Sequence, residues 1–514
     1  MGINCRLMRP AGAAVAIVLV SLTPAWAQGT QQPTAPSTAP NSADLGAGQR
    51  LYQKWCINCH GEHGDGAGPA ADFLHPRPRD FRQGLFKIRT TKSGQLPSDE
   101  DLFNVITNGM PGTAMPAWEE TLSEPERRQL VVFLKTFSRR FTRATTPPEP
   151  IKIGARVPSS ADSIAEGKRL FREIECFKCH GNEGRADGPS APELTDDWGA
   201  PIRPANLRKP WRFRGGHTPE ALYLRLQSGI SGTPMPSFGD SLDNEKTWHL
   251  VNFVISLWPD PSGNSPPLPV VLKGRHTKGD IPVQPGDAFW QNVESSYSPL
   301  VGQVIREPRH FTPSVDGVQI QAAYNDRELA FRLVWDDPTN SKPDVKSGTF
   351  EDMVAIEFPV RIPTGGKRPF FLMGDPELSV QLLRWGSASG ITELNGNGLD
   401  KLRPQPASGQ EATTEAEFTD GQYRVVIKRP LKTVNSAQDI QFEPGRFIPI
   451  AFFVWNGSNG ETGSKMALTS WYYFFAEPVL PAITYLYPVV AVVIVGGLQW
   501  WGIRRLQRRR GGPG

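Results

Sequence analysis

The sequence predicts a multidomain α plus β protein with two all-helical domains, one β-sandwich domain and one C-terminal transmembrane helix. A C-x-x-C-H motif occurs twice, at an offset of 120 residues, within segments of helical apolar spacing. Residues 285–477 hold apolar runs that are divided by turn-forming clusters, as strands are. From Val479 to Ile503 no residue is charged, and this run is long enough to cross a bilayer core of about 30 Å.

Length and composition restrict the alternatives. The chain has 514 residues, and a chain of this length is expected to form roughly three domains. Lys and Arg number 56 against 52 Asp and Glu, and this near balance argues against a nucleic-acid partner. Four of the five cysteines lie in the two C-x-x-C-H motifs, which disfavours a disulfide scaffold.

The N-terminus predicts a secretory signal peptide over residues 1–27. A basic start precedes an apolar stretch, and Ala25-Trp26-Ala27 is a small-residue cleavage site. Cys5 precedes the apolar stretch and is expected to leave with the signal peptide. Residues 28–44, rich in Gln, Thr, Pro, Ser and Ala, predict a flexible leader. The mature protein is therefore expected outside the cytoplasm.

A duplicated helical domain follows the leader. Residues 45–143 and 161–258 are the two copies, because the segment Asn108–Pro116 recurs as Ser228–Pro236 at the same offset as the motif.

Apolar spacing and proline content indicate the local structure around these copies. Acidic first turns and helical spacing predict helices over Asp99–Asn108 and Glu124–Phe137. The proline-rich stretches 144–160 and 259–284 are expected to be linkers.

Each C-x-x-C-H motif predicts covalent attachment of one haem. The two thiols must reach the two vinyl groups of the haem, and the adjacent histidine must reach the iron from the same face. One helical turn provides that geometry. A zinc site would need four close ligands, and no others lie near either motif. The attachment residues are Cys56, Cys59 and His60 in the first copy and Cys176, Cys179 and His180 in the second.

The second axial ligand of each iron is predicted to be a methionine. Met115 and Met235 each lie 55 residues after the histidine of their copy, and each precedes a proline, which keeps its backbone extended. Met110 competes in the first copy, but its equivalent in the second is Ile230. A methionine ligand raises the reduction potential. Three other histidines have no partner in the opposite copy and are expected to be surface or locally hydrogen-bonded residues: His63, His75 and His217.

The two copies resemble class I cytochrome c domains. The resemblance rests on the attachment motif and covers residues 45–143 and 161–258. It implies an all-helical fold, His/Met coordination of iron and electron transfer without bond chemistry. The candidates to neutralise the haem propionates are Arg79, Arg82, Arg89, Arg208 and Arg214.

Residues 285–477 are expected to form the β-sandwich. Val318–Gln321, Leu329–Trp335 and Tyr423–Lys428 favour strands, and Phe447–Trp455 is a continuous apolar strand candidate. The block contains no cysteine, so any cofactor in it would be held without a covalent bond to sulfur.

Two runs in this block, Phe370–Asp375 and Gly463–Trp471, resemble the haem b γ-subunit of ethylbenzene dehydrogenase and its relatives. That family serves periplasmic molybdenum enzymes. The resemblance implies a non-covalent haem b whose iron is held by a methionine and a lysine, and the matching residues are Met373 and Lys465. Met466 is an alternative to Lys465, but neighbouring strand residues face opposite ways. The γ-subunits of that family lack the duplicated haem c domains, so this chain departs from them by fusion.

The C-terminal run 479–503 predicts one transmembrane helix. Its aliphatic core, Val489–Val495, is flanked by Tyr485, Tyr487, Trp500 and Trp501, as in an aromatic belt. The basic tail 504–514 holds five arginines that are expected on the cytoplasmic side. The globular part is then periplasmic and tethered to a bacterial inner (cytoplasmic) membrane.

Together with the resemblances, these features predict a membrane-anchored periplasmic cytochrome that relays electrons between a molybdoenzyme and the respiratory chain. Its expected partners are the catalytic and iron–sulfur subunits of that enzyme, and a soluble cytochrome or a membrane respiratory complex. No nucleophile–base set, Walker loop or dinucleotide fingerprint occurs, so no substrate turnover is assigned to the chain. Two alternatives stay open: a haem-free sandwich that binds a ligand or partner, and an enzyme with one five-coordinate haem.

Overall fold

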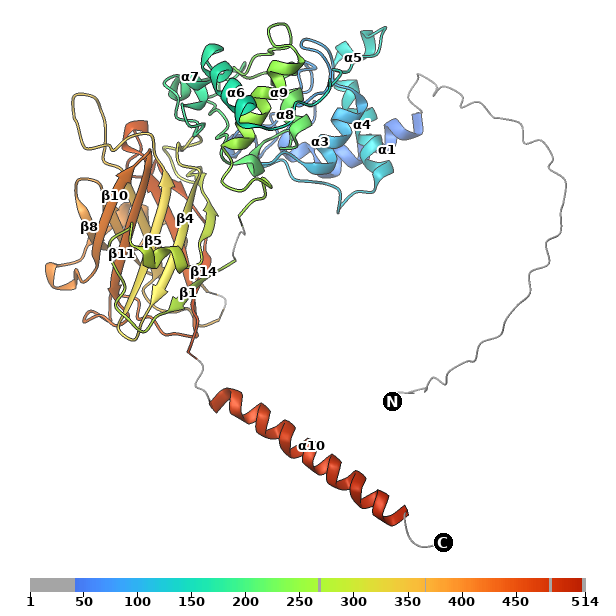
Figure 1. Cartoon of the computed structure of the whole chain (residues 1–514). Coiled ribbons are helices and arrows are strands. Elements are labelled where there is room, and N and C mark those ends of the chain that lie inside the picture. Colours follow the sequence, from blue (N-terminus) through green and yellow to red (C-terminus); the bar gives the residue numbers. More distant parts are fainter. Residues whose placement is uncertain (1–41, 267–269, 366, 480–482, 511–514) are drawn as a thin grey trace.

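The computed structural model describes residues 42–266, 270–365, 367–479 and 483–510. Helices occupy the first part of the chain, strands the middle and one long helix the end, which confirms the predicted fold class (Figure 1). The predicted signal peptide, residues 1–27, lies outside the described residues, and so does the predicted leader up to residue 41.

The two helical domains repeat one arrangement. The first contains α1 (Ser42–Trp55), α2 (Ile57–His60), α3 (Asp99–Asn108), α4 (Glu124–Leu134) and α5 (Arg139–Arg143), with 3-10 turns at Ala71–Phe73 and Lys135–Phe137. The second contains α6 (Ala161–Glu173), α7 (Phe177–His180), α8 (Pro219–Ser228) and α9 (Asn244–Ser256), with 3-10 turns at Ala191–Glu193 and Pro210–Arg212. The helix expected up to Phe137 thus ends at Leu134 and tightens into a 3-10 turn.

Each helical domain is built on a close crossing of its first and last long helices. A Cβ added at Gly48 of α1 would lie 2.1 Å from the carbonyl oxygen of Gln129 in α4. A Cβ at Gly167 of α6 would lie 2.0 Å from the carbonyl oxygen of His249 in α9. Only glycine permits this approach. The crossing therefore fixes where α1 and α6 end, and each C-x-x-C-H motif begins at that end.

The sandwich is made of fourteen described strands: β1 (Val271–His276), β2 (Ser296–Pro299), β3 (Val301–Gly302), β4 (Gly317–Tyr324), β5 (Glu328–Asp336), β6 (Met353–Pro359), β7 (Val380–Gly386), β8 (Gly390–Gly396), β9 (Arg403–Pro404), β10 (Thr413–Thr419), β11 (Gln422–Pro430), β12 (Phe447–Trp455), β13 (Ala467–Leu468) and β14 (Tyr472–Ala476). Their order is β10-β11-β5-β4-β1-β14-β12-β6-β7-β8-β9. Short 3-10 turns at Ala288–Asn292, Leu399–Lys401, Ala407–Gly409 and Gly457–Asn459 connect them.

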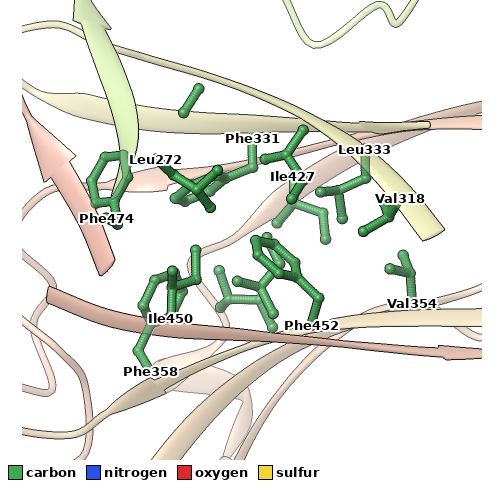
Figure 2. Packing of buried hydrophobic residues seen from close by; sticks show 14 of the residues in the cluster. Leu272, Val318, Phe331, Leu333, Val354, Phe358, Ile427, Ile450, Phe452 and Phe474 are labelled. Atoms are coloured by element: carbon green, nitrogen blue, oxygen red, sulfur yellow. The ribbon is translucent and has the colours of Figure 1, made fainter. Parts of the chain in front are cut away.

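The main core lies between the two halves of this strand order. Side chains of β4, β5 and β11 face side chains of β6 and β12, as Figure 2 shows for Phe331 opposite Phe358 and Phe452. A second apolar cluster covers the outer face of β6, β7 and β12, because alternate residues of each strand point away from the main core. This outer cluster contains Met373 and Met466.

The stretch 259–284, expected to be a linker, contains β1. This strand pairs in parallel with β14 through Val271–Gly274 and with β4 through Arg275 and His276, so it joins the two halves of the sandwich. Its partners follow it by about 50 and 200 residues in the chain, and a short strand with such distant partners carries little local signal.

The second helical domain is fixed to the sandwich by a buried ionic network. Lys209 Nζ lies 2.5 Å from Asp316 Oδ1 and 3.3 Å from Asp336 Oδ2, and Arg212 reaches the second oxygen of Asp316 at 2.9 Å. Burial alone would raise the pKa of Asp316, but Lys209 and Arg212 more than offset burial, and the pKa is lowered. The Trp211 ring packs edge-on against Tyr297 at 5.8 Å.

The last helix, α10 (Ile483–Arg510), stands clear of the domains (Figure 1). Its segment Leu486–Gln507 has 22 residues and a mean hydropathy of 1.7, and its most apolar window is wholly unburied. It is long and apolar enough to cross a membrane. The helix continues past the predicted end at residue 503 and includes the basic residues up to Arg510.

Replacing Lys209 with methionine removes the cation that bridges Asp316 and Asp336. Breaking a buried ion pair from one side costs on the order of 3–5 kcal/mol. We expect the K209M full-length protein to show a lowered urea midpoint and new protease cleavage between the second helical domain and the sandwich.

The matched control is Arg169→Met, which removes an exposed pair with Glu166 and Glu173 and should change neither readout. Both carboxylates beside Lys209 have lowered pKa values. Their stabilisation is therefore complete above the unfolded Asp pKa of about 3.9 and is lost as pH falls through the folded values. Equal behaviour of K209M and R169M would contradict the role given to Lys209.

Candidate haem sites

The two C-x-x-C-H motifs adopt the same helical turn. The backbone N–H of His60 donates to the Cys56 carbonyl at 2.9 Å, and that of His180 donates to the Cys176 carbonyl at 2.9 Å. All four motif cysteines are free thiols. Each motif therefore presents two unpaired sulfurs and one imidazole from a single turn, which suits thioether attachment of a haem.

The ring of each motif histidine is oriented by one backbone carbonyl. His60 Nδ1 lies 3.2 Å from the Arg79 carbonyl oxygen, and His180 Nδ1 lies 2.9 Å from the Ala205 carbonyl oxygen. A carbonyl only accepts, so each Nδ1 carries the proton and each Nε2 keeps a lone pair for a metal. Burial lowers the pKa of His60 to about 4 and also lowers the pKa of His180. Both imidazoles are thus neutral near pH 7, as a metal ligand must be.

The two methionine loops share one hydrogen-bond pattern. The N–H of Met110 donates to the Met115 carbonyl at 3.0 Å, and the N–H of Ile230 donates to the Met235 carbonyl at 3.2 Å. A threonine two residues before each methionine accepts from the methionine N–H, at 3.1 Å in the first loop and 3.3 Å in the second. Met115 therefore occupies the same place as Met235, and Met110 occupies the place of Ile230.

The five arginines proposed for the propionates have different surroundings. Arg82 is exposed and pairs with Asp80 at 2.9 Å. Arg89 is buried and reaches into the second domain, where it donates to the Ser228 carbonyl at 2.7 Å. Arg79 and Arg214 are half-buried, and the removal of water around their guanidinium groups lowers the pKa of each to about 10. Arg208 is half-buried.

The residues present fit a haem beside His60. Both terminal nitrogens of Arg79 are buried without a hydrogen-bond partner among the described residues, and the peptide carbonyl of the same residue orients the His60 ring. A buried donor without a partner is costly. A carboxylate delivered with the haem would satisfy it. Arg79 is one of the five arginines named from the sequence, but the sequence does not show which of the five keeps unpaired donors, because this depends on which loops meet.

Met373 lies in a strained turn inside the outer apolar cluster of the sandwich. Its φ of 64° is in the left-handed region that residues other than glycine seldom adopt. Its side chain is fully buried, and its N–H donates to Glu357 Oε2 at 3.3 Å. Burial raises the pKa of Glu357 well above its usual range. Strain of this kind gathers at functional positions.

Lys465 and Met466 face opposite ways, as expected. Lys465 is exposed and makes no ion pair with the described residues, whereas Met466 is fully buried in the same cluster as Met373. A cavity of about 500 Å³ lies beside this cluster, lined by Arg368, Pro369, Phe370, Phe371, Asp375, Ser470 and Trp471. Phe371 and Trp471 also pack against the cluster. Neither Met373 nor Lys465 lines this cavity, and Lys465 would have to turn inward to reach the cluster that holds Met373.

Family comparisons divide the chain in the same way. The family described as Cytochrome C oxidase, cbb3-type, subunit III matches residues 43–134 and 162–254. The family described as Ethylbenzene dehydrogenase matches residues 395–467, a range that includes Lys465 and not Met373. These matches confirm both resemblances drawn from the sequence.

Three individual proteins are similar to parts of this chain. A protein described as respiratory nitrate reductase haem subunit ORF7 from Haloferax mediterranei is 26% identical over 220 residues, 42% of this chain and 78% of that protein. The chlorate reductase subunit gamma of Ideonella dechloratans is 25% identical over 211 residues, 40% of this chain and 84% of that protein. Cytochrome c55X of Paracoccus denitrificans is 31% identical over 101 residues, 20% of this chain and 82% of that protein.

Exchanging Met115 for leucine tests the sixth ligand of the first iron. Loss of the thioether should lower the potential of one haem by on the order of 0.1 V, within the roughly 0.8 V range that axial ligands control. The reduced protein should also bind carbon monoxide at that iron. A redox titration followed in the haem absorption bands measures the potential, and a difference spectrum of the reduced protein with and without carbon monoxide measures the binding.

The matched variant is Met110→Leu, five residues away in the same loop. It should leave both potentials and carbon monoxide binding unchanged, because its counterpart in the other loop is Ile230. A shift in M110L instead of M115L would reverse the assignment.

Proposed function

Because this chain belongs to the cytochrome c family and carries an ethylbenzene dehydrogenase-type domain, we propose that it relays electrons between a periplasmic molybdoenzyme and the respiratory chain. The observation that carries the proposal is the packing of two C-x-x-C-H domains together with the sandwich. Arg89 joins the first helical domain to the second, and Lys209 joins the second to the sandwich. Sites held in a fixed arrangement suit passage of an electron from one to the next.

In this proposal each helical domain holds one covalent haem c, which supplies one-electron redox chemistry. The first haem is attached to Cys56 and Cys59 with His60 and Met115 as axial ligands. The second is attached to Cys176 and Cys179 with His180 and Met235 as axial ligands. The protein holds the imidazoles neutral and orients them through backbone carbonyls. It performs no bond chemistry, and no catalytic residue is assigned.

The sandwich is proposed to hold one haem b between Met373 and Lys465. The burial and strain of Met373 and the adjacent aromatic-lined cavity support this site. Arg368 on the cavity rim would face a propionate.

We infer the partners of this chain from the descriptions of the proteins that are similar to it. Two of them are described as haem or gamma subunits of nitrate and chlorate reductases. We infer that this chain likewise serves the catalytic and iron–sulfur subunits of a molybdenum enzyme, and exchanges electrons with a soluble cytochrome or a membrane complex.

The membrane anchor is assigned to α10, with the arginines from Arg504 onward in the cytoplasm and the globular part in the periplasm of an inner membrane. Tethering raises the local concentration of the haems near membrane complexes.

A haem-free sandwich is the second candidate, and one observation favours it. A groove of about 360 Å³ with Trp385, Phe418 and Tyr423 in its lining lies on the sandwich, and aromatic side chains of this kind suit a small ligand. In that case the protein is a dihaem cytochrome c with a ligand- or partner-binding domain.

Haem analysis separates these two functions. The full-length protein, matured for haem c, should contain two covalent haems and one haem b that acid–acetone extracts. Met373→Leu and Lys465→Leu should each lose the extractable haem and keep the covalent ones. Pyridine haemochrome spectra before and after extraction give the counts.

The matched variant is Met466→Leu, which changes an equally buried methionine of the same cluster and should keep haem b. Two covalent haems with nothing extractable, in folded protein supplied with haem, would remove the haem b assignment and favour the haem-free sandwich.

The proposed electron relay predicts that this chain is part of a molybdenum-containing complex. Affinity purification of the tagged full-length chain from detergent-treated membranes of its source should recover about one molybdenum per chain. The same purification from cells that carry the untagged chain is the control. Metal analysis of the eluate measures this. Haem-replete protein that elutes without molybdenum, under conditions that keep the membrane complexes intact, would contradict the molybdoenzyme partner.

A further inference from the structure

Four basic side chains from both helical domains meet at the interface between these domains. His75, Arg79 and Lys87 belong to the first domain and Arg214 to the second, and Arg214 acts electrostatically on each of the other three. Lys87 is only 7% exposed and forms no hydrogen bond or ion pair with the described residues. Burial, aided by Arg214 and Arg79, lowers the pKa of Lys87 to about 7.

The carboxylates near this interface cluster do not neutralise it. Asp196 and Asp197 act on Arg79 from the second domain, but neither forms an ion pair with it. The Arg79 guanidinium lies over the Trp198 ring at 4.4 Å, and both of its terminal nitrogens have no hydrogen-bond partner among the described residues. Buried cations without paired anions are strongly unfavourable. The interface cluster therefore suits an anionic group that carries more than one acceptor oxygen.

The cluster lies beside the first attachment motif. The peptide carbonyl of Arg79 holds the His60 ring, so the side chain of this residue starts next to the place of the first haem. The carboxylates that a haem brings to such a place are its propionates.

Each helical domain contributes an arginine to the interface, Arg89 from the first domain and Arg214 from the second. Arg89 crosses to the second domain and bonds to Ser231 and to the Ser228 carbonyl. Arg214 lies toward the first domain, where a Cβ on the next residue, Gly215, would be 3.2 Å from Ile88 Cδ1.

The methionine loops show the same reciprocity. A Cβ added at Gly112, in the Met115 loop, would lie 3.3 Å from the carbonyl oxygen of Arg212 in the second domain. A Cβ added at Gly232, in the Met235 loop, would lie 2.7 Å from Arg79 Nη1 in the first domain. Each loop that is proposed to bear an iron ligand thus abuts the other domain.

We propose that the interface cluster receives the propionates of the first haem and that Arg214, supplied by the second domain, sets the potential of that haem in trans. This proposal rests on the proposed function, because it requires haem c in both domains. A fixed positive charge beside a haem favours the reduced form, since oxidation adds a positive charge to the iron. The second domain therefore raises the potential of the first haem and couples the two sites across their interface.

The test is the potential of the first haem in full-length Arg214→Gln protein. The second haem is first moved to low potential by Met235→His in every protein compared, so that the two titrate apart. We expect R214Q to shift the oxidation equilibrium of the first haem about tenfold toward the oxidised form, which is 59 mV for one electron. Arg214→Lys, which keeps the charge, should restore most of the potential.

The control is Arg128→Gln, which removes an exposed arginine of the first domain that pairs with Glu100 and Glu124, and it should leave the potential unchanged. Haem content is counted before titration, so loss of a covalent haem site in the parent protein would be a failure of the proposed function and not of this inference. With both haems present, a first-haem potential that is the same in R214Q, R128Q and the parent overturns the role of Arg214. If R214Q does not fold, the first-haem potential of Arg214→Met is compared with that of R214K, and equal potentials overturn the inference.

Discussion

One hydrogen bond, present in both helical domains, is the constraint on which the cytochrome half depends. The ring N–H of the motif histidine donates to a backbone carbonyl, of Arg79 in one domain and Ala205 in the other. This bond selects the tautomer that leaves Nε2 free, and it ties the motif to the loop that follows it. In the first domain the same loop supplies Arg79 and Lys87. One segment of chain therefore orients the His60 ring and supplies part of the charge of the interface cluster, to which the second domain adds Arg214.

The domain contacts extend this constraint over the molecule. Electron transfer without bond chemistry needs sites at fixed separations, and the chain achieves this with buried ionic contacts. Lys209 is held between two carboxylates of the sandwich, while Arg89 is held by a carbonyl of the neighbouring domain. A buried ion pair adds little net stability over an apolar contact but tolerates few alternative arrangements. Contacts of this type suit a relay better than a sliding apolar surface would.

The sequence predicted what depends on short-range pattern. The C-x-x-C-H turns, the repeat and the final helix each lie within one continuous run of residues, and the fold class followed from them. Strand β1 was missed because its pairing partners are far along the chain and its six residues sit among prolines. His75 was expected to be a surface or locally hydrogen-bonded residue for lack of a repeat partner, and it lies among charged groups of both copies. The similarity of the two copies shows which residues match each other, but it does not show which residues of one copy contact the other copy.

The sandwich poses a different physical problem from the helical domains. A haem c stays attached through two thioether bonds, whereas a haem b stays only while its ligands and its pocket hold it. Met373 is fully buried in the outer apolar cluster and does not line the adjacent cavity, so its sulfur would have to be uncovered before it could bind iron. Lys465 is exposed, and an ammonium group has no lone pair to give, so it can bind iron only after it loses a proton and turns toward the cluster. Binding of haem b would thus be coupled to closure of the loop before β13, and the helical domains would keep their haems under conditions in which the sandwich loses its own.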